Sequence, residues 1–131
     1  MKRHMPFTAY AWSDVAYFRM MGRNTQTWDM PWKIDASEKY IVSDRYHYVY
    51  SLEELADLGR ILTGLKSSGA DTFVVFHNDP QANSLLNGFQ LRKLLQPKQT
   101  LIAPPNLLAT FPALRDIAIS EDTGILQLRG S

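Results

Sequence analysis

Two short apolar runs, each closed by polar residues, organise the hydrophobic pattern of the chain. The runs 14–20 and 72–77 are rich in β-branched and aromatic residues, which predicts two buried strands. Between them, leucine and isoleucine recur at helical spacing over residues 52–67, and a second such series covers 83–95. This order predicts an α/β fold in which parallel strands alternate with helices. Functional groups are then expected at the carboxyl ends of the strands.

Local signals give both predicted helices definite ends. Ser51 and Glu54, three positions later, form a capping box at the start of the first helix. Gly69 follows the end of that helix, and Pro97 ends the second. The helices are therefore expected to begin and end where the apolar periodicity does.

The rest of the chain is less regular. Residues 98–131 are predicted to form an irregular tail, with one helical turn at 106–111 and a hairpin formed by 117–119 and 125–128. Residues 22–47 lack periodicity and contain two tryptophans. These tryptophans either pack the loop onto the sheet or line a ligand cleft.

Composition indicates a single globular domain over residues 1–131. Hydrophobic residues make up 45% of the chain and charged residues 21%, and the net charge of +1 gives no general attraction to nucleic acid or to a membrane. Acidic residues also offset the basic ones within the aromatic stretch, which argues against nucleic acid. The chain has no cysteine, and no apolar stretch approaches the roughly 18 residues that span a bilayer. We therefore expect a cytoplasmic protein with no membrane partner.

Polar residues gather where the two predicted strands end: Arg19, Arg23, Asn24, His77, Asn78 and Asp79. Arg19 lies inside an apolar strand, so it needs a partner if it is buried. That partner is either an acid on a neighbouring strand or an anionic ligand, because the planar guanidinium suits both. Both interpretations stay open at this stage.

His77 is the candidate for proton transfer near these residues. Its spacing to Asp79 matches no recognised metal motif. Nucleophile-elbow and phosphate-loop motifs are also absent from the sequence. No metal site and no cofactor are therefore predicted.

Four short motifs occur in order between residues 14 and 95. They are the run 17–24 with Trp28 after it, the run 48–55, the run 75–79, and Asn87. The first resembles the strand ending in Arg-Phe-His-Gly-Arg that is typical of the YecE-like family, number seventy-two among the domains of unknown function. The second resembles the family's Tyr-x-Tyr-Ser-x-Glu-Glu-Leu helix start, and the third its Phe-x-Asn-Asn strand end.

The resemblance implies a TIM-like (β/α) barrel of which this chain carries only the carboxyl-terminal half. It also adds Trp28 and Asn87 to the candidate ligand-binding residues. Met21 stands where the family usually has a histidine, and His77 stands where it usually has the first asparagine. A thioether neither titrates nor donates a proton, so Met21 cannot replace a catalytic histidine.

Two functions are compatible with these patterns. In the first, an enzyme or enzyme fragment binds an anionic or phosphorylated small molecule through the strand-end residues, Trp28 and Asn87, with His77 as the tentative catalytic group. In the second, the aromatic segment 22–50 serves a non-catalytic protein-interaction module or an inactive fragment. A partial barrel exposes sheet edges and apolar faces. We therefore predict self-association, or dependence on a missing amino-terminal half.

Overall fold

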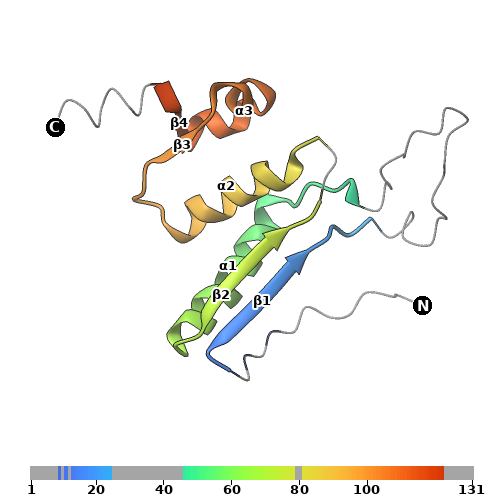
Figure 1. Ribbon diagram of the computed structural model, residues 1–131, viewed down its shortest axis with the longest axis vertical. Coiled ribbons are helices and arrows are strands. Elements are labelled where there is room, and N and C mark those ends of the chain that lie inside the picture. Colours follow the sequence, from blue (N-terminus) through green and yellow to red (C-terminus); the bar gives the residue numbers. More distant parts are fainter. Residues whose placement is uncertain (1–8, 10, 12, 25–45, 79–80, 123–131) are drawn as a thin grey trace, which may run out of the picture.

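The computed structural model describes residues 9, 11, 13–24, 46–78 and 81–122. Its elements follow in the order β1 (Val15–Met20), α1 (Leu52–Ser67), β2 (Asp71–Phe76), α2 (Asn83–Leu95), β3 (Leu101–Ala103), α3 (Pro105–Thr110), the 3₁₀ helix η2 (Pro112–Asp116) and β4 (Ala118–Ser120) (Figure 1). The predicted alternation of parallel strands with helices is confirmed. Within the described residues, the strands do not close into a barrel.

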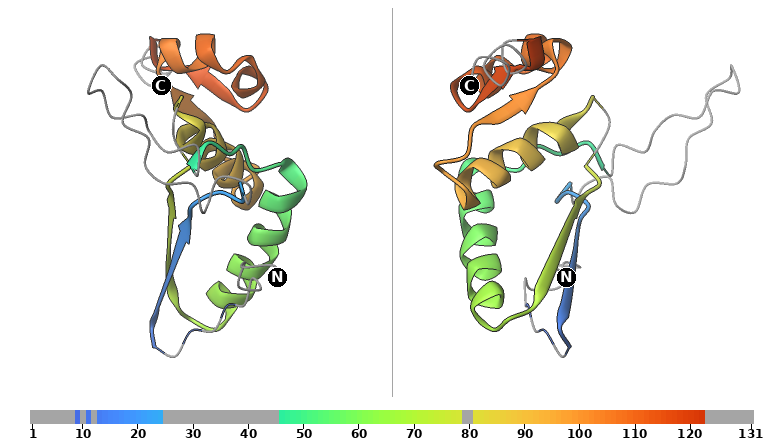
Figure 2. Two further views of the ribbon diagram at one scale, coloured as in Figure 1. Left: turned by 90° about the vertical axis from the view of Figure 1, so that its right-hand side faces the viewer. Right: turned by 60° about the vertical axis from the view of Figure 1, so that its left-hand side comes forward.

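Strands β1 and β2 form a parallel pair whose two faces differ. The register runs from Val15 opposite Asp71 to Met20 opposite Phe76. Helices α1 and α2 both lie on one side of this pair, as Figure 2 shows. No described element covers the other side, so only one face of the strands is buried. The predicted burial of the two strands therefore holds for one face only.

The first hydrophobic core lies between this sheet and the two helices. Its buried members are Met20, Tyr50, Leu55, Leu58, Leu62 and Leu91, and Phe18, Val74 and Phe76 pack against them. The predicted helix 52–67 and its capping box are both confirmed, because the Ser51 and Glu54 side chains each bond the other's backbone N–H. Packing of the leucine face into the first core stabilises the helix in addition to the cap.

A second core joins the short strands of the carboxyl-terminal part to α2. Leu86 of α2 packs with β3, β4 and the short helices between them. Ala118 lies opposite Leu101 in a parallel pair of β4 with β3, a pairing that the sequence did not predict. The second arm of the predicted hairpin, 125–128, lies outside the described residues. The expected helical turn at 106–111 is present as α3, so the segment predicted to be irregular contains several short elements.

In the described part of the chain, no helix combines the length and apolar character needed to cross a membrane.

Candidate functional site

The ends of β1 and β2 bring Arg19 and His77 together. The distance from Arg19 Nη2 to His77 Nδ1 is 2.7 Å. A guanidinium has only donors, so His77 Nδ1 accepts this hydrogen bond and the ring hydrogen of the neutral imidazole is on Nε2. The ring of Tyr46 stacks on His77, with centroids 4.7 Å apart and planes 11° from parallel. Two neighbours therefore fix the position of the imidazole.

Arg19 is exposed, on the face of the sheet that no described helix covers. Among the described residues it has no acidic partner, and its hydrogen bond goes to His77. The condition under which Arg19 needs a partner, burial of its side chain, is therefore not met. Its exposure removes the need for a compensating acid, because water solvates the charge.

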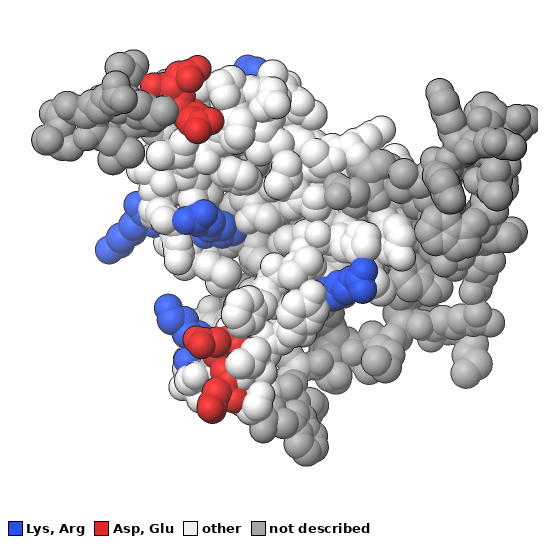
Figure 3. All heavy atoms as spheres, viewed as in Figure 1, with Lys and Arg blue, Asp and Glu red and all other residues white. Residues whose placement is uncertain are grey.

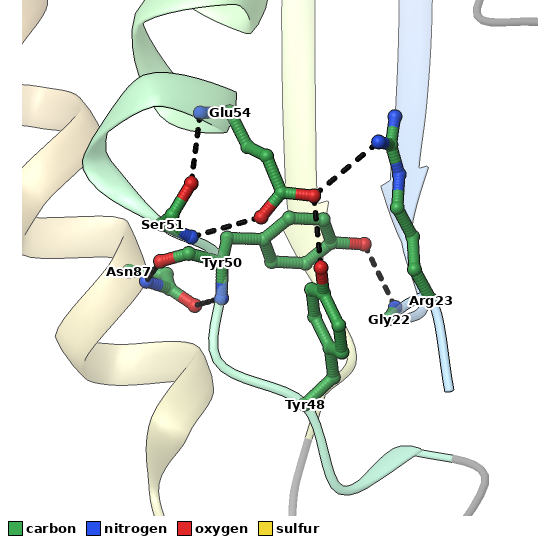
Figure 4. A network of polar contacts seen from close by, with 7 residues as sticks. All are labelled: Gly22, Arg23, Tyr48, Tyr50, Ser51, Glu54 and Asn87. Atoms are coloured by element: carbon green, nitrogen blue, oxygen red, sulfur yellow. Dashed lines mark hydrogen bonds and ion pairs between the residues drawn. The ribbon is translucent and has the colours of Figure 1, made fainter. Parts of the chain in front are cut away.

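Arg23, in contrast, is held by a carboxylate. Its Nη1 lies 3.3 Å from Glu54 Oε1, which also accepts a hydrogen bond of 2.8 Å from the Tyr48 hydroxyl (Figure 4). The other carboxylate oxygen, Oε2, accepts from the backbone N–H of Ser51 at 2.9 Å. Glu54 of the capping box thus also connects the segment after β1 to helix α1.

Two buried asparagines form the centre of the strand-end network. Asn87 Oδ1 accepts from the Tyr50 N–H at 2.9 Å, and Asn87 Nδ2 donates to the Tyr50 carbonyl at 3.0 Å (Figure 4). Asn78 Nδ2 donates to Asn87 Oδ1 at 2.9 Å and to the Tyr48 carbonyl at 2.8 Å. Both asparagine side chains have an exposed fraction of 0%. Their amides bind the chain itself, and contact with a ligand stays a prediction.

The Tyr50 hydroxyl completes this network. It accepts a 2.7 Å hydrogen bond from the backbone N–H of Gly22. Gly22 has a φ of 87°, in the left-handed region that favours glycine. The turn after β1 is therefore fixed by a tyrosine that Asn87 holds through its backbone.

The structure gives less information about the remaining predicted ligand-binding residues, Asn24, Asp79 and Trp28. Asn24 is half-buried and has an interaction partner. Asp79 and Trp28 lie outside the described residues. Among the described side chains, no group of three or more histidines, cysteines and acids could hold a metal ion. The structure thus brings Arg19 and His77 together on one face and places Arg23, Asn78 and Asn87 in a separate polar network.

Sequence reasoning missed the role of the tyrosines at 46, 48 and 50. They belong to the aromatic segment 22–50, and two of them to the motif 48–55, but no contact was predicted for them, although their alternation just before the Ser51 cap is visible in the sequence. Tyr46 stacks on His77, while Tyr48 and Tyr50 contact each other edge to face with their ring centroids 5.0 Å apart. A tyrosine at every second position before a helix cap was the available signal.

The environment of Tyr48 predicts a loss of stability at alkaline pH. Burial, followed by the hydrogen bond to Glu54 and the charge of that carboxylate, raises the pKa of Tyr48 from 10.0 to about 12. Because the pKa is raised in the folded state, this stabilisation is complete below pH 10 and is lost as the pH rises through 12. We expect Tyr48→Phe to flatten the decline of the melting temperature across this window.

The matched control is Tyr17→Phe, which removes an exposed hydroxyl from the uncovered sheet face. Melting curves recorded by circular dichroism in steps of pH would measure both declines. Equal slopes for the wild type and Tyr48→Phe would contradict the assignment.

Sequence comparison identifies the family. The pattern described as "Protein of unknown function DUF72" matches residues 1–110. The chain belongs to this family. This DUF72 chain is also 34% identical over 89 residues to the UPF0759 protein YunF of Bacillus subtilis (strain 168), and the match covers 68% of this chain and 30% of YunF. No solved structure matches the chain. The matched region thus spans about a third of this relative's length.

Proposed function

We propose that this DUF72 chain forms part of a TIM-like (β/α) barrel and binds an anionic or phosphorylated small molecule at the carboxyl ends of β1 and β2. The observation that carries the proposal is the Arg19–His77 pair, with 2.7 Å between Nη2 and Nδ1. A guanidinium beside a fixed imidazole presents several N–H donors on one exposed face. Such donors suit the oxygens of a phosphate or carboxylate.

The chemistry of the pair supports an anion as the ligand. The guanidinium has five N–H donors, and its described contact with His77 uses one of them. Within the described residues, nothing hydrogen-bonds to His77 Nε2, so its N–H can donate to the same ligand. His77 is then also the group that would carry a proton to or from the ligand at Nε2.

The other predicted residues have supporting roles in this proposal. Arg23 forms an ion pair with Glu54. This ion pair weakens the attraction of Arg23 for an anionic ligand. Asn78 and Asn87 hold the segment of Tyr48 and Tyr50 in place. Asn24, Asp79 and Trp28 follow the strand ends in the sequence, and contact with the ligand is proposed for them on this position alone.

The barrel part of the proposal rests on the uncovered sheet face. Each of the parallel strands β1 and β2 is followed by a helix on the same side of the sheet. In a closed barrel of such units the helices lie outside and the opposite face of the strands lines the interior. The matched region covers only 30% of YunF, so the remaining length of such a relative is available for further units.

Phosphate binding tests the anion site directly. We expect inorganic phosphate to raise the melting temperature and to shift the ¹H–¹⁵N signals of the His77 ring. Arg19→Ala should weaken this binding by about tenfold or more, because it removes the permanent charge.

Arg115→Ala is the control, since it removes the same charge from an exposed residue of η2. The proposal fails if phosphate shifts neither signal, or if both variants respond equally. Equal responses would show a general effect of ionic strength.

A protein-interaction module is the second candidate function. The observation in its favour is the uncovered apolar face of β1 and β2, since exposed apolar patches of this kind mark binding surfaces. Residues 25–45 of the aromatic segment lie outside the described residues. The exposed sheet face is therefore the part of this proposal that the structure allows to be developed.

A further inference from the structure

The uncovered face of β1 and β2 has an apolar centre made of four large side chains. Their exposed fractions are 51% for Val15, 64% for Tyr17, 56% for Phe73 and 41% for Val75. Tyr17 lies opposite Phe73 in the strand register, at the middle of the face. Exposure of neighbouring aromatic and β-branched side chains is unfavourable in water. Within the described part of the chain, no element covers them.

The two ends of this face carry opposite charges. Asp71 begins β2, is exposed, and has the same strand parity as Phe73 and Val75 of the uncovered face. Arg19 lies at the other end, opposite Val75. In Figure 3, acidic atoms with basic atoms next to them lie beside the start of the strands, and a separate basic group lies beside their end. On the face itself, Asp71 lies at one end, the apolar side chains lie in the middle and Arg19 lies at the other end.

We propose that a second copy of this chain covers the face, with its strands running antiparallel to those of the first. In this dimer Arg19 of each copy lies near Asp71 of the partner subunit. The inference goes beyond anion binding, and it names the partner for the interaction surface of the second candidate function. It is an alternative to the proposed barrel, in which the same face would line the interior. It would stand even if no anion bound at Arg19.

The strand register places the charges correctly for such a dimer. Tyr17 and Phe73 lie midway between the Val15–Asp71 level and the Arg19–Val75 level. Consider a two-fold axis that lies in the plane of the interface, perpendicular to the strands, at the level of Tyr17 and Phe73. Rotation about this axis exchanges the two ends of the face. The ends are separated by about 13 Å at roughly 3.3 Å per residue. Both ion pairs can therefore form at once, and the rings of Tyr17 and Phe73 meet at the axis.

The opposite alignment is disfavoured by charge. With strands parallel across the interface, Arg19 would lie at the same end of the face as the partner's Arg19, and Asp71 at the same end as the partner's Asp71. Like charges brought close together in an interface repel strongly. The charge pattern thus selects the antiparallel arrangement. A face of two six-residue strands is small for an interface, so we expect a dimer that dissociates on dilution.

An anion at Arg19 and the partner's Asp71 compete for one guanidinium. Resting on the proposed anion site, we therefore expect phosphate to shift the equilibrium toward the monomer. Because the dimer itself is measured without phosphate, failure of the anion proposal leaves this inference testable. Conversely, the phosphate signals of His77 can be followed in dilute, monomeric protein.

A charge exchange tests the inference. Sedimentation velocity over a range of concentrations in phosphate-free buffer should show the wild type passing from monomer to dimer. Arg19→Glu and Asp71→Arg should each weaken the dimer by about tenfold or more, because each creates like-charge contacts at both ends. An equimolar mixture of the two variants should restore the dimer, since opposite charges then face each other in the heterodimer.

Two further variants keep the test decisive. Arg19→Glu with Asp71→Arg in one chain should restore the homodimer, and Arg115→Glu, which makes the same charge change on η2, should leave it intact. Circular dichroism melts check that each variant folds. The inference is overturned if the wild type stays monomeric at every concentration, if the single variants dimerise like the wild type, or if mixing restores nothing.

Discussion

Replacing Asn87 with alanine is expected to lower the free energy of unfolding by about 3–5 kcal/mol. The side chain is fully buried and bonds the N–H and the carbonyl of Tyr50, the amide of Asn78 and the side chain of Gln90. Alanine would leave several of these groups buried without a partner, and each such group costs about 1–3 kcal/mol. Part of this loss would be regained if water entered the space.

Chemical denaturation followed by circular dichroism would measure the change. Asn106→Ala is the matched control, because Asn106 is an exposed asparagine whose amide oxygen accepts from the adjacent Leu107 N–H. We expect the control to lose less than about 1 kcal/mol. Similar losses in both variants would show that Asn87 is not the centre of the network.

The elements that local sequence determines were predicted well. Helix α1 begins at the Ser51 cap and presents its leucines at helical spacing, so its bounds need no knowledge of the remaining chain. Helix α2 was predicted over the residues that it occupies, 83–95. Both helices carry their signals within a few residues of their ends, which is why periodicity and capping suffice.

The errors concern contacts between residues far apart in the chain. The apolar residues of β1 and β2 are found on both faces of the strands, and the sequence does not say which face the helices cover. The sequence therefore leaves open whether Arg19 is buried; in the structure it lies on the uncovered face with His77, a residue 58 positions away. The parallel pairing of β4 with β3 likewise depends on α3 and η2 folding between them, and no local signal in the sequence predicts it.

The same distinction explains which candidate residues became structural. Asn78, Asn87 and Arg23 were predicted from their place at strand ends and in family motifs. The Asn87 amide instead holds the backbone of Tyr50, 37 residues away in the sequence. Motifs identify residues under strong constraint, and a buried amide that satisfies a distant backbone is as constrained as a ligand contact. Burial separates the two cases, and burial requires the structure.

Helix α2 is expected to make the two hydrophobic cores unfold together. Its Leu91 belongs to the core under β1 and β2, while its Leu86 belongs to the core with β3 and β4. Leu58→Ala in the first core and Leu114→Ala in the second change the same side chain at equally buried positions. We expect each to lower the free energy of unfolding by about 2–5 kcal/mol, through lost burial and the cavity left behind.

Amide hydrogen exchange of α1 tells whether the cores are coupled. If α2 links them, Leu114→Ala speeds exchange in α1, although Leu114 lies in the second core, because losing the second core removes support from the helix that both cores share. Leu94→Ala, at an exposed position of α2, is the control and should change exchange in α1 little. Unchanged exchange in α1 after Leu114→Ala would mean that residues 101–120 form a separately unfolding unit. In that case the strand-end network of Asn78, Asn87 and Tyr50 would depend on the first core alone.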